Sequence, residues 1–226
     1  MSQKRLVLFD YDGVIVDSME HNLAVAGRAA KLVGHHRVPT RQDVDRVENM
    51  SFEDVAREIG LPEEKLPVYA RHVYENLSSH ADTLQVFPGM AEALLELGRL
   101  YTLAIVTTND ECVVEDFLRS RGLSRCFAAI LGRSSGTKAE NLRRAASMLG
   151  FPRCRVYVIG DSVSDIRQAK AAGVKSVAVT WGYHSEPKLR AESPDFVAHT
   201  PDEIVDLLAV KRAGSSSSVP QGKPTR

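Results

Sequence analysis

Two aspartates, Asp10 and Asp12, come directly after the apolar run from Leu6 to Phe9, and Gly13 follows them. A short continuous apolar run is typical of a strand buried on both faces of a parallel sheet. In an extended chain, residues two apart point to the same side, so both carboxylates can act on one ligand. Gly13 lets the chain turn away without placing a Cβ atom in a crowded pocket. The pattern therefore indicates a functional site at the end of a strand.

The same pattern returns far downstream. The apolar run from Val156 to Ile159 leads into Gly160 and Asp161, and Asp165 stands four residues beyond Asp161. In an open parallel sheet, the carboxyl ends of the strands face a common crevice in which ligands bind. The two pairs of carboxylates can therefore meet on one metal ion or one substrate.

Hydroxyl and ammonium groups lie at two further element ends. Thr107, Thr108 and Asn109 follow one predicted strand, and Lys138 stands at the start of a predicted helix. A hydroxyl at a strand end usually caps a helix, and a lysine near a helix start is usually a solvated charge. The lysine is also unfavourable at the positive end of the helix dipole, so its position suggests an anion bound at that helix end.

Taken together, these residues describe a phosphate-transfer site. A carboxylate that approaches a phosphate dianion is repelled, because two unit charges about 4 Å apart cost about 4 kcal/mol at an effective dielectric constant of about 20. Mg²⁺ between Asp10, Asp161 and the phosphate would cancel most of this repulsion. Lys138 and a threonine hydroxyl would hold the remaining phosphate oxygens. Asp12 could then reach the leaving oxygen.

Other site templates do not fit the sequence. The segment that begins at Asp10 resembles the opening of an EF-hand loop, but its glycine comes two positions early and His21 occupies the twelfth position. The segment from Gly132 to Lys138 lacks the glycine spacing of a P-loop. Neither a Gly-x-Gly-x-x-Gly motif nor a Gly-x-Ser-x-Gly motif occurs, so dinucleotide binding and a serine nucleophile on such an elbow have no support.

Strands and helices must alternate beyond about residue 87 to position these groups. We predict strands at 6–9, 102–106, 128–131, 156–159 and 176–179, and helices at 91–97, 112–121, 139–149 and 165–172. This alternation predicts an α/β fold with a parallel, Rossmann-like sheet.

A helical segment interrupts this order after the first strand. The run from Asp17 to Glu20 predicts a capping box and a helix that ends at Gly34. Helical periodicity continues over 44–59 and 63–77. We therefore expect a Rossmann-like core formed by 1–17 and 85–212, a helical cap formed by 18–84 and a disordered tail over 213–226, with hinges near Asp17-Ser18 and Leu84-Phe87.

Charge and composition set limits on the partners. Lys and Arg together number 29, as do Asp and Glu, so bulk charge suggests neither nucleic acid nor an anionic membrane as a partner. No apolar stretch approaches the roughly 20 residues that span a bilayer. Cys112, Cys126 and Cys154 lack metal-ligand spacing and suggest reduced thiols. We expect a cytoplasmic monomer or homodimer.

With these motifs in this order, the chain resembles the haloacid dehalogenase superfamily, and in particular its phosphoglycolate-phosphatase-like branch. The resemblance extends to about residue 210 and implies a Rossmann-like core with a mobile helical cap inserted after the first motif. It rests on Asp10-Tyr11-Asp12-Gly13-Val14, Thr107 after Ile105-Val106, Lys138, and Gly160-Asp161 with Asp165.

The resemblance implies separate roles for the four aspartates. Asp10 would be the nucleophile that forms an aspartyl phosphate, and Asp12 the acid that protonates the leaving group and then the base that activates water. Asp10, the main-chain carbonyl of Asp12, and Asp161 would hold Mg²⁺. Asp165 would complete or orient the ligand shell.

The resemblance also assigns the phosphate-binding groups, with one departure from the family pattern. Thr107 and Lys138 would bind the phosphoryl oxygens. The branch often has Thr-Asn at its second motif, whereas this chain has Thr107-Thr108-Asn109. Without a gap Thr107 takes the motif position, and a shift by one residue gives that position to Thr108.

An acid at position 12 separates phosphatases from true dehalogenases, which resemble this core but lack an acid there because a leaving halide needs no proton. We therefore expect a Mg²⁺-dependent phosphatase that hydrolyses a small phosphorylated metabolite, with phosphoglycolate or a sugar phosphate as the leading class. The alternative is a β-phosphoglucomutase-like phosphomutase, whose cap carries a basic residue that grips a second phosphate. Phe52 stands where we would look for that residue. A third hypothesis is a non-catalytic module that binds Mg²⁺ and phosphate, for which a proton donor at Asp12 has no use.

Substrate identity should depend on the cap. His21 and Asn22, just beyond the predicted hinge, are near the place where a substrate would lie. The first section of the cap is locally basic, and its charged residues form either a solvated helix face or a partial site for a carboxylate or second phosphate. These residues are Arg28, Lys31, His35, His36, Arg37 and Arg41.

Overall fold

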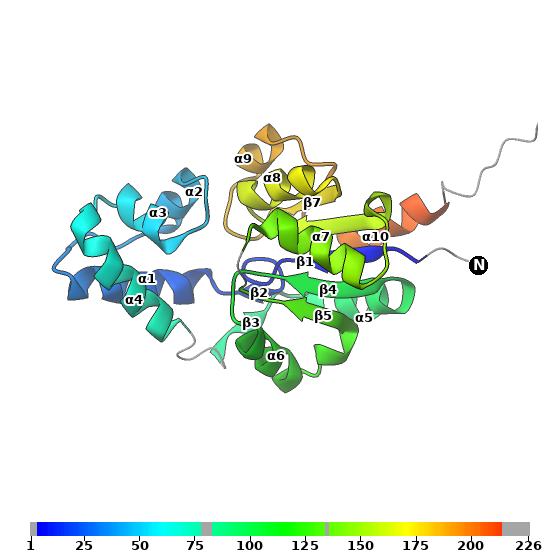
Figure 1. Cartoon of the computed structure of the whole chain (residues 1–226), viewed down its shortest axis with the longest axis horizontal. Coiled ribbons are helices and arrows are strands. Elements are labelled where there is room, and N and C mark those ends of the chain that lie inside the picture. The colour runs from blue at the N-terminus through cyan, green and yellow to red at the C-terminus, as the bar shows by residue number, and fades with distance from the viewer. Residues whose placement is uncertain (1–3, 78–82, 134–135, 214–226) are drawn as a thin grey trace, which may run out of the picture.

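The computed structural model describes residues 4–77, 83–133 and 136–213 of the chain (Figure 1). Within these residues the main sheet has six parallel strands in the order β5-β4-β1-β6-β7-β8. The strands are β1 (Leu6–Phe9), β4 (Thr102–Val106), β5 (Phe127–Leu131), β6 (Val156–Gly160), β7 (Lys175–Val179) and β8 (Phe196–Ala198). The predicted α/β fold with a parallel, Rossmann-like sheet is confirmed.

The central strand β1 explains why its sequence is apolar without interruption. Leu6 pairs with Thr102 of β4 on one side and with Val156 of β6 on the other. Val7 and Phe9 belong to the apolar core on one face of the sheet, whereas Leu6 and Leu8 belong to the core on the opposite face. Because both faces are covered, every position of the strand is buried.

Helices cover both faces of the sheet (Figure 1). Apolar residues of α5 (Met90–Leu100), α6 (Glu111–Ser120) and α10 (Pro201–Ala213) pack on the face that contains Phe9. Residues of α7 (Lys138–Met148) and α8 (Val163–Ala172) pack on the face that contains Leu8. The short helix α9 (Glu186–Ala191) buries Leu189 against α8 and β7. Three-residue 3₁₀ turns precede β5 and β6, at Ser124–Cys126 and Arg153–Arg155.

In the described part of the segment between β2 and β3, four α-helices stand beside the sheet and form the left part of Figure 1. Three of them pack around a separate apolar core that includes Val25, Ile59 and Tyr69, and the remaining one buries Val44 in a second, smaller cluster. We call this helical part the cap. Its helices are α1 (Met19–Leu32), α2 (Arg41–Arg46), α3 (Phe52–Glu58) and α4 (Leu66–Asn76), with a 3₁₀ turn at Glu63–Lys65 before α4.

Two short strands join the cap to the sheet. Strand β2 (Val16–Asp17) pairs in antiparallel orientation with β3 (Gln85–Val86), so the chain enters and leaves the cap side by side. Both segments lie where the sequence predicts hinges. The cap boundaries and the hinge motion itself stay predictions.

The capping box predicted at the start of α1 is wrong. Ser18 precedes the helix, but its side chain makes no capping hydrogen bond and its φ of −104° and ψ of 0° are already close to helical. Its hydroxyl instead lies 2.9 Å from the hydroxyl of Tyr183, which is 165 residues away in sequence. A tertiary contact has taken the group that local sequence rules assign to the helix.

Two other predictions differ from the structure. The helical stretch predicted over 44–59 is divided into α2 and α3, because Val47 is extended and Ser51 caps a new helix. Helix α10 ends with Ala213, which the sequence assigns to the tail, and residues 214–226 of that tail lie outside the described residues.

No helix in the described ranges is both long and apolar enough to cross a membrane. Cys112, Cys126 and Cys154 are all free thiols, and Cys112 and Cys154 are exposed. This agrees with the interpretation of the three cysteines as reduced thiols.

Candidate active site

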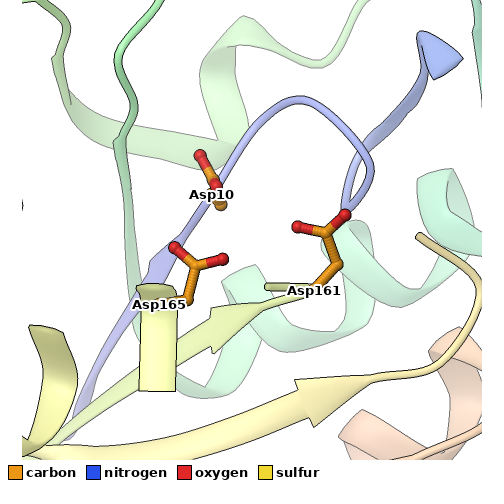
Figure 2. A group of neighbouring side chains, drawn as sticks. All are labelled: Asp10, Asp161 and Asp165. Carbon is orange, nitrogen blue, oxygen red and sulfur yellow. The ribbon is translucent and has the colours of Figure 1, made fainter. Parts of the chain in front are cut away.

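The order of the strands brings the predicted site residues together. Asp10 follows β1, Thr107 follows β4 and Asp161 follows β6, and β1 lies between the other two strands. Their carboxyl ends therefore lie next to one another at one edge of the sheet, where the strand order reverses direction. Asp165 joins them from the first turn of α8, as Figure 2 shows.

Asp10, Asp161 and Asp165 form a compact cluster of carboxylates. One oxygen from each lies within 4.8 Å of the others. Burial raises the pKa of Asp10 to about 7, against the pull of a neighbouring lysine. Burial, and then the charges of Asp165 and Asp10, raise the pKa of Asp161 well above its ordinary value. A divalent cation would relieve this repulsion, and three carboxylates are the hard oxygen ligands that Mg²⁺ prefers, so the donor set fits the predicted metal.

Lys138 bridges two of these carboxylates. Its Nζ lies 2.7 Å from Oδ2 of Asp10 and 2.6 Å from Oδ1 of Asp165. Burial alone would lower the pKa of Lys138, but the two carboxylates raise it above its ordinary value, so the side chain is an ammonium ion. This pairing explains how a lysine can occupy the first position of α7 despite the helix dipole.

Asp165 is held from both sides. Its Oδ2 accepts hydrogen bonds from the main-chain N–H (3.1 Å) and the hydroxyl (2.7 Å) of Ser162, which forms a capping box at the start of α8. Its Oδ1 accepts the bond from Lys138. Burial would raise the pKa of Asp165, but Lys138 and Ser162 lower it below the ordinary value. The local sequence Ser-x-x-Asp thus fixes the orientation of a site carboxylate.

Asp161 is packed closely against Gly13. Its Oδ2 accepts a hydrogen bond from the main-chain N–H of Tyr183 at 2.7 Å. A Cβ atom on Gly13 would lie 2.0 Å from that oxygen and 2.3 Å from the ring of Tyr183, and Gly13 has a φ of +76°. The absence of a side chain at position 13 is therefore required both by space and by backbone conformation.

Asp12 lies in a less cationic setting than Asp10. Its Oδ2 accepts a hydrogen bond of 3.1 Å from Nδ2 of Asn109. Burial raises the pKa of Asp12, although hydrogen bonds from Ser18 and Asn109 oppose the shift. A raised pKa favours the protonated form that a proton donor needs. Sequence reasoning did not include Asn109 among the site residues, although it noted its place beside Thr108.

A cavity of about 290 Å³ lies between the sheet and the cap above these residues. Its sheet side includes Asp10, Asp12 and Asp161, and Arg133, which follows β5, also lines it. The cap side is largely apolar. It is formed by residues that include Met19, Leu23, Val44, Met50, Phe52 and Val55.

Comparison with known proteins agrees with this geometry. The family model described as haloacid dehalogenase-like hydrolase matches residues 7–179, which include the strand ends after β1, β4 and β6. The chain belongs to the haloacid dehalogenase-like hydrolase family. The resemblance inferred from the motifs is thereby confirmed.

Relatives of this family member include named phosphatases. A phosphoglycolate phosphatase of Synechococcus elongatus is 31% identical over 207 residues, covering 89% of this chain and 96% of that protein. A probable phosphatase, IndB, of Dickeya dadantii is 29% identical and covers 96% of this chain and 98% of its own length. The fold matches a haloacid dehalogenase-like hydrolase of Streptococcus pneumoniae with a TM-score of 0.82, at 24% identity and with coverage of 92% and 100%. The chain is a phosphatase of the haloacid dehalogenase-like family.

Thr107 and Thr108, the two candidates for the phosphate-binding threonine, both line the cavity. Thr107 is buried, and its hydroxyl accepts a hydrogen bond of 3.1 Å from the N–H of Asn109. Its own N–H donates to the carbonyl of Leu131 at 3.0 Å, so the ladder between β4 and β5 extends to this residue. The choice between Thr107 and Thr108 as the phosphate-binding residue stays a prediction.

The basic residues in the first section of the cap do not line the cavity above the aspartates. Arg28, Lys31 and Arg41 border a separate shallow hollow on the cap, and Arg37 pairs with Asp43. This favours the solvated-face interpretation of the basic residues over a partial anion site in the catalytic cavity. Of the two residues just beyond the hinge, Asn22 lines the cavity, whereas Nε2 of His21 is bonded to the carbonyl of Leu77 at 2.9 Å.

Proposed function

We propose that this phosphatase hydrolyses a small phosphate monoester with Mg²⁺, through an aspartyl phosphate formed on Asp10. The observation that carries the proposal is the convergence of Asp10, Asp161, Asp165 and Lys138 below a cavity that also contains Asp12. Relatives named phosphoglycolate phosphatases support the same reaction type. Phosphoglycolate and sugar phosphates are the leading substrate class expected from the sequence, so they are the compounds with which other substrates should be compared.

The first chemical step transfers the phosphoryl group to the enzyme. A carboxylate oxygen of Asp10 attacks phosphorus, and the bond between phosphorus and the leaving oxygen breaks. Asp12 donates its proton to that oxygen, so the substrate leaves as an alcohol. Lys138 opposes protonation of Asp10 by its charge and its hydrogen bond, and Thr107 or Thr108 donates a hydrogen bond to a phosphoryl oxygen. When bound, Mg²⁺ would be held by Asp10 and Asp161, with Asp165 beside them, and would neutralise charge between nucleophile and phosphate.

The second step hydrolyses the aspartyl phosphate. Asp12, now ionised, accepts a proton from a water molecule whose oxygen attacks phosphorus, and the bond between phosphorus and Asp10 breaks. Phosphate is released and both aspartates return to their initial states. The cap above the cavity excludes other water during the first step and must move to admit water and release products.

The phosphomutase alternative receives less support. Phe52 lines the cap side of the cavity, at the position where that hypothesis needs a basic residue for a second phosphate. The non-catalytic alternative does not account for Asp12, whose carboxyl group lines the cavity and is held by Asn109, because binding Mg²⁺ and phosphate alone has no use for a proton donor there.

Rapid-mixing kinetics with 4-nitrophenyl phosphate and Mg²⁺ test the proposal. Replacement of the nucleophile by Asp10→Asn should reduce kcat by a factor on the order of 10⁴ or more, with an unchanged circular dichroism spectrum. Asp12→Asn should instead release about one equivalent of nitrophenolate quickly and then turn over slowly, because nitrophenolate leaves without a proton whereas hydrolysis of the aspartyl phosphate needs the base.

Two controls complete this experiment. EDTA should abolish the rapid phase in the wild type and in Asp12→Asn, and Mg²⁺ should restore it. A rapid phase in Asp10→Asn equal to that of the wild type would rule out Asp10 as the nucleophile. Release of an isomerised phosphate ester, dependent on an added bisphosphate, would support the phosphomutase instead.

A further inference from the structure

The wall that faces the aspartates across the cavity is built mainly from hydrocarbon and thioether side chains of the cap. Met19, Val44 and Val55 are buried in one apolar cluster, and Leu23 and Met50 pack against it. These residues come from α1, α2, α3 and the loop between α2 and α3. The wall is therefore one continuous apolar surface although its residues are far apart in sequence.

Part of this wall is not covered by protein. Leu23, Met50 and Phe52 line the cavity and are only partly buried. Apolar surface that faces water is unfavourable by roughly 25 cal/mol per Å², so covering it with an apolar ligand is favourable. The flexible thioethers of Met19 and Met50 can also adjust to ligands of different shape.

Two polar side chains on the cap side, Asn22 and Ser51, make hydrogen bonds within the protein. Nδ2 of Asn22 donates to the hydroxyl of Tyr183 at 2.7 Å. The hydroxyl of Ser51 donates to Asp54 at 2.8 Å and accepts from the N–H of the same residue at 3.0 Å. A sugar would bring several hydroxyl groups to this wall, and each hydroxyl buried without a partner is unfavourable. A sugar phosphate is therefore a poor match for the cap side.

Arg133 lines the cavity, and its positive charge would favour an acidic leaving group such as glycolate. Its guanidinium carbon lies 4.7 Å from the centre of the Tyr74 ring, in a cation–π contact that joins the sheet side to the cap. Its Nε donates to the main-chain carbonyl of Thr108 at 3.2 Å. These contacts use the face of the guanidinium and one of its five N–H groups, so the phosphoglycolate arm of the test below decides whether its other N–H groups favour a carboxylate.

The volume of the cavity sets the size of the ligand. An apolar cavity of about 150 Å³ is enough to hold benzene, whereas this cavity measures about 290 Å³. We propose that the natural substrate is a phosphate monoester of an apolar alcohol or phenol about the size of a benzene ring, with the phosphate at Asp10 and the apolar group against the cap wall. This inference rests on the proposed function, because it needs the phosphate to lie at the aspartates.

A series of alkyl phosphates tests the proposal, because their leaving groups differ in apolar area and little in acidity. With Mg²⁺, kcat/KM should rise from ethyl to butyl to hexyl phosphate by about fourfold per methylene, the equivalent of about 0.8 kcal/mol, until the wall is covered. Phosphoglycolate, in which a carboxylate replaces the methyl group of ethyl phosphate, and glucose 6-phosphate should be at least about tenfold poorer than butyl phosphate.

Substitution in the wall provides a second test. Met50→Gln keeps the length of the side chain but makes it polar, and it should lower the ratio of hexyl to ethyl phosphate kcat/KM by about fivefold. Met148→Gln makes the same change on an exposed face of α7 and should leave both values unchanged. Thermal denaturation of each variant shows whether the fold is retained.

The outcomes separate this inference from the proposed function. The enzyme could hydrolyse all the esters but prefer phosphoglycolate or glucose 6-phosphate to butyl phosphate. That result would overturn the proposal of an apolar substrate and leave the proposed Mg²⁺-dependent phosphatase activity intact. A ratio unchanged by Met50→Gln in a folded variant would also overturn it. Failure to hydrolyse any ester, 4-nitrophenyl phosphate included, would overturn the proposed function and this inference with it.

Discussion

Gly13 is fixed by the space between two neighbours. A side chain at this position would meet both Asp161 and Tyr183, and the positive φ adds backbone strain to the steric conflict. Gly60 offers a matched control, because its φ of +84° is similar but nothing lies within 4 Å of a Cβ atom there.

Gly60→Ala should therefore lower the free energy of unfolding only by the strain of a left-handed alanine, about 1 to 2 kcal/mol. Gly13→Ala should cost about 1 to 3 kcal/mol more, because neighbours must move, and should also reduce kcat. Urea unfolding of both variants at neutral pH measures the difference. Equal losses of stability would show that the close approach at Gly13 does not limit the fold.

His184 links the pH of the solution to stability. The side chain is buried, and its Nδ1 accepts a hydrogen bond of 3.0 Å from the N–H of Val163 at the start of α8. Burial, and then the charge of Lys188, lower the pKa of His184 to about 4. The unfolded chain, with an ordinary histidine pKa of about 6.5, takes up a proton that the folded protein excludes.

The neutral histidine thus favours folding above about pH 6.5, and this contribution is lost as the pH falls toward about 4. Between pH 7 and pH 5 the wild type should lose about 1 to 2 kcal/mol more stability than His184→Asn, which keeps an acceptor for Val163 but does not titrate. Urea unfolding at both pH values provides the comparison. His36→Asn, at an exposed histidine, serves as the control, and parallel pH dependences of the wild type and His184→Asn would contradict the assignment.

At the scale of elements, a group of polar contacts, here called the clasp, attaches the end of α2 to helices α8 and α9 beside the sheet. Lys188 of α9 donates hydrogen bonds to the main-chain carbonyls of Asp45 and Val47. Arg167 of α8 pairs with Glu48 at 2.8 Å. These contacts hold the cap against the side of the sheet that carries α8 and α9, and cap opening must break or carry them.

Lys188→Met should release α2 without disturbing the sheet. Hydrogen bonds to a charged donor contribute about 1.5 to 3 kcal/mol when buried, and we expect about half of this at a partly exposed site. Loss of that free energy makes local opening easier, so the amides in 41–48 should exchange severalfold faster. Hydrogen exchange followed by mass spectrometry measures this. Lys175→Met breaks the ion pair of Lys175 with Asp195 within the sheet domain and should leave that segment unchanged; similar exchange in both variants would argue against the clasp.

Strand ends were predictable because burial on both faces produces uninterrupted apolar runs, so Asp10 and Asp161 could be placed before the structure was known. Short elements were not: β2 and β3 have two residues each, too few for any periodicity. Long-range pairing was also invisible. Asn109 meets Asp12 across 97 residues of sequence, and only the adjacency of β1 and β4 brings them together.

At the scale of the whole molecule, one loop connects the cluster of carboxylates to the cap. The loop after β7 holds Asp161 through the N–H of Tyr183, while the hydroxyl of the same tyrosine meets Ser18 and Asn22 at the start of α1. The indole N–H of Trp181 donates to the carbonyl of Val14 at 3.1 Å. These hydrogen bonds link the start of α1 to the backbone that positions Asp161.

If the carboxylate cluster binds Mg²⁺ as proposed, it should make the metal-free protein less stable and the metal-bound protein more stable. Without metal, burial and the charges of Asp165 and Asp10 make an ionised Asp161 unfavourable. Asp161→Asn removes this repulsion and keeps an oxygen for the N–H of Tyr183. It should therefore stabilise the metal-free protein by about 1 kcal/mol, a rise in Tm of about 2 to 4 °C for a chain of this size.

The same substitution should abolish stabilisation by metal. A ligand that binds only the folded state at about 100 times its Kd stabilises it by about 2.7 kcal/mol, so Mg²⁺ should raise the Tm of the wild type and EDTA should reverse the rise. Asp161→Asn should show little response to either. Asp206→Asn, which removes a charge from an exposed position of α10, should respond like the wild type. Scanning calorimetry with and without Mg²⁺ measures all three proteins, and a full Mg²⁺ response in Asp161→Asn would exclude Asp161 from the metal site.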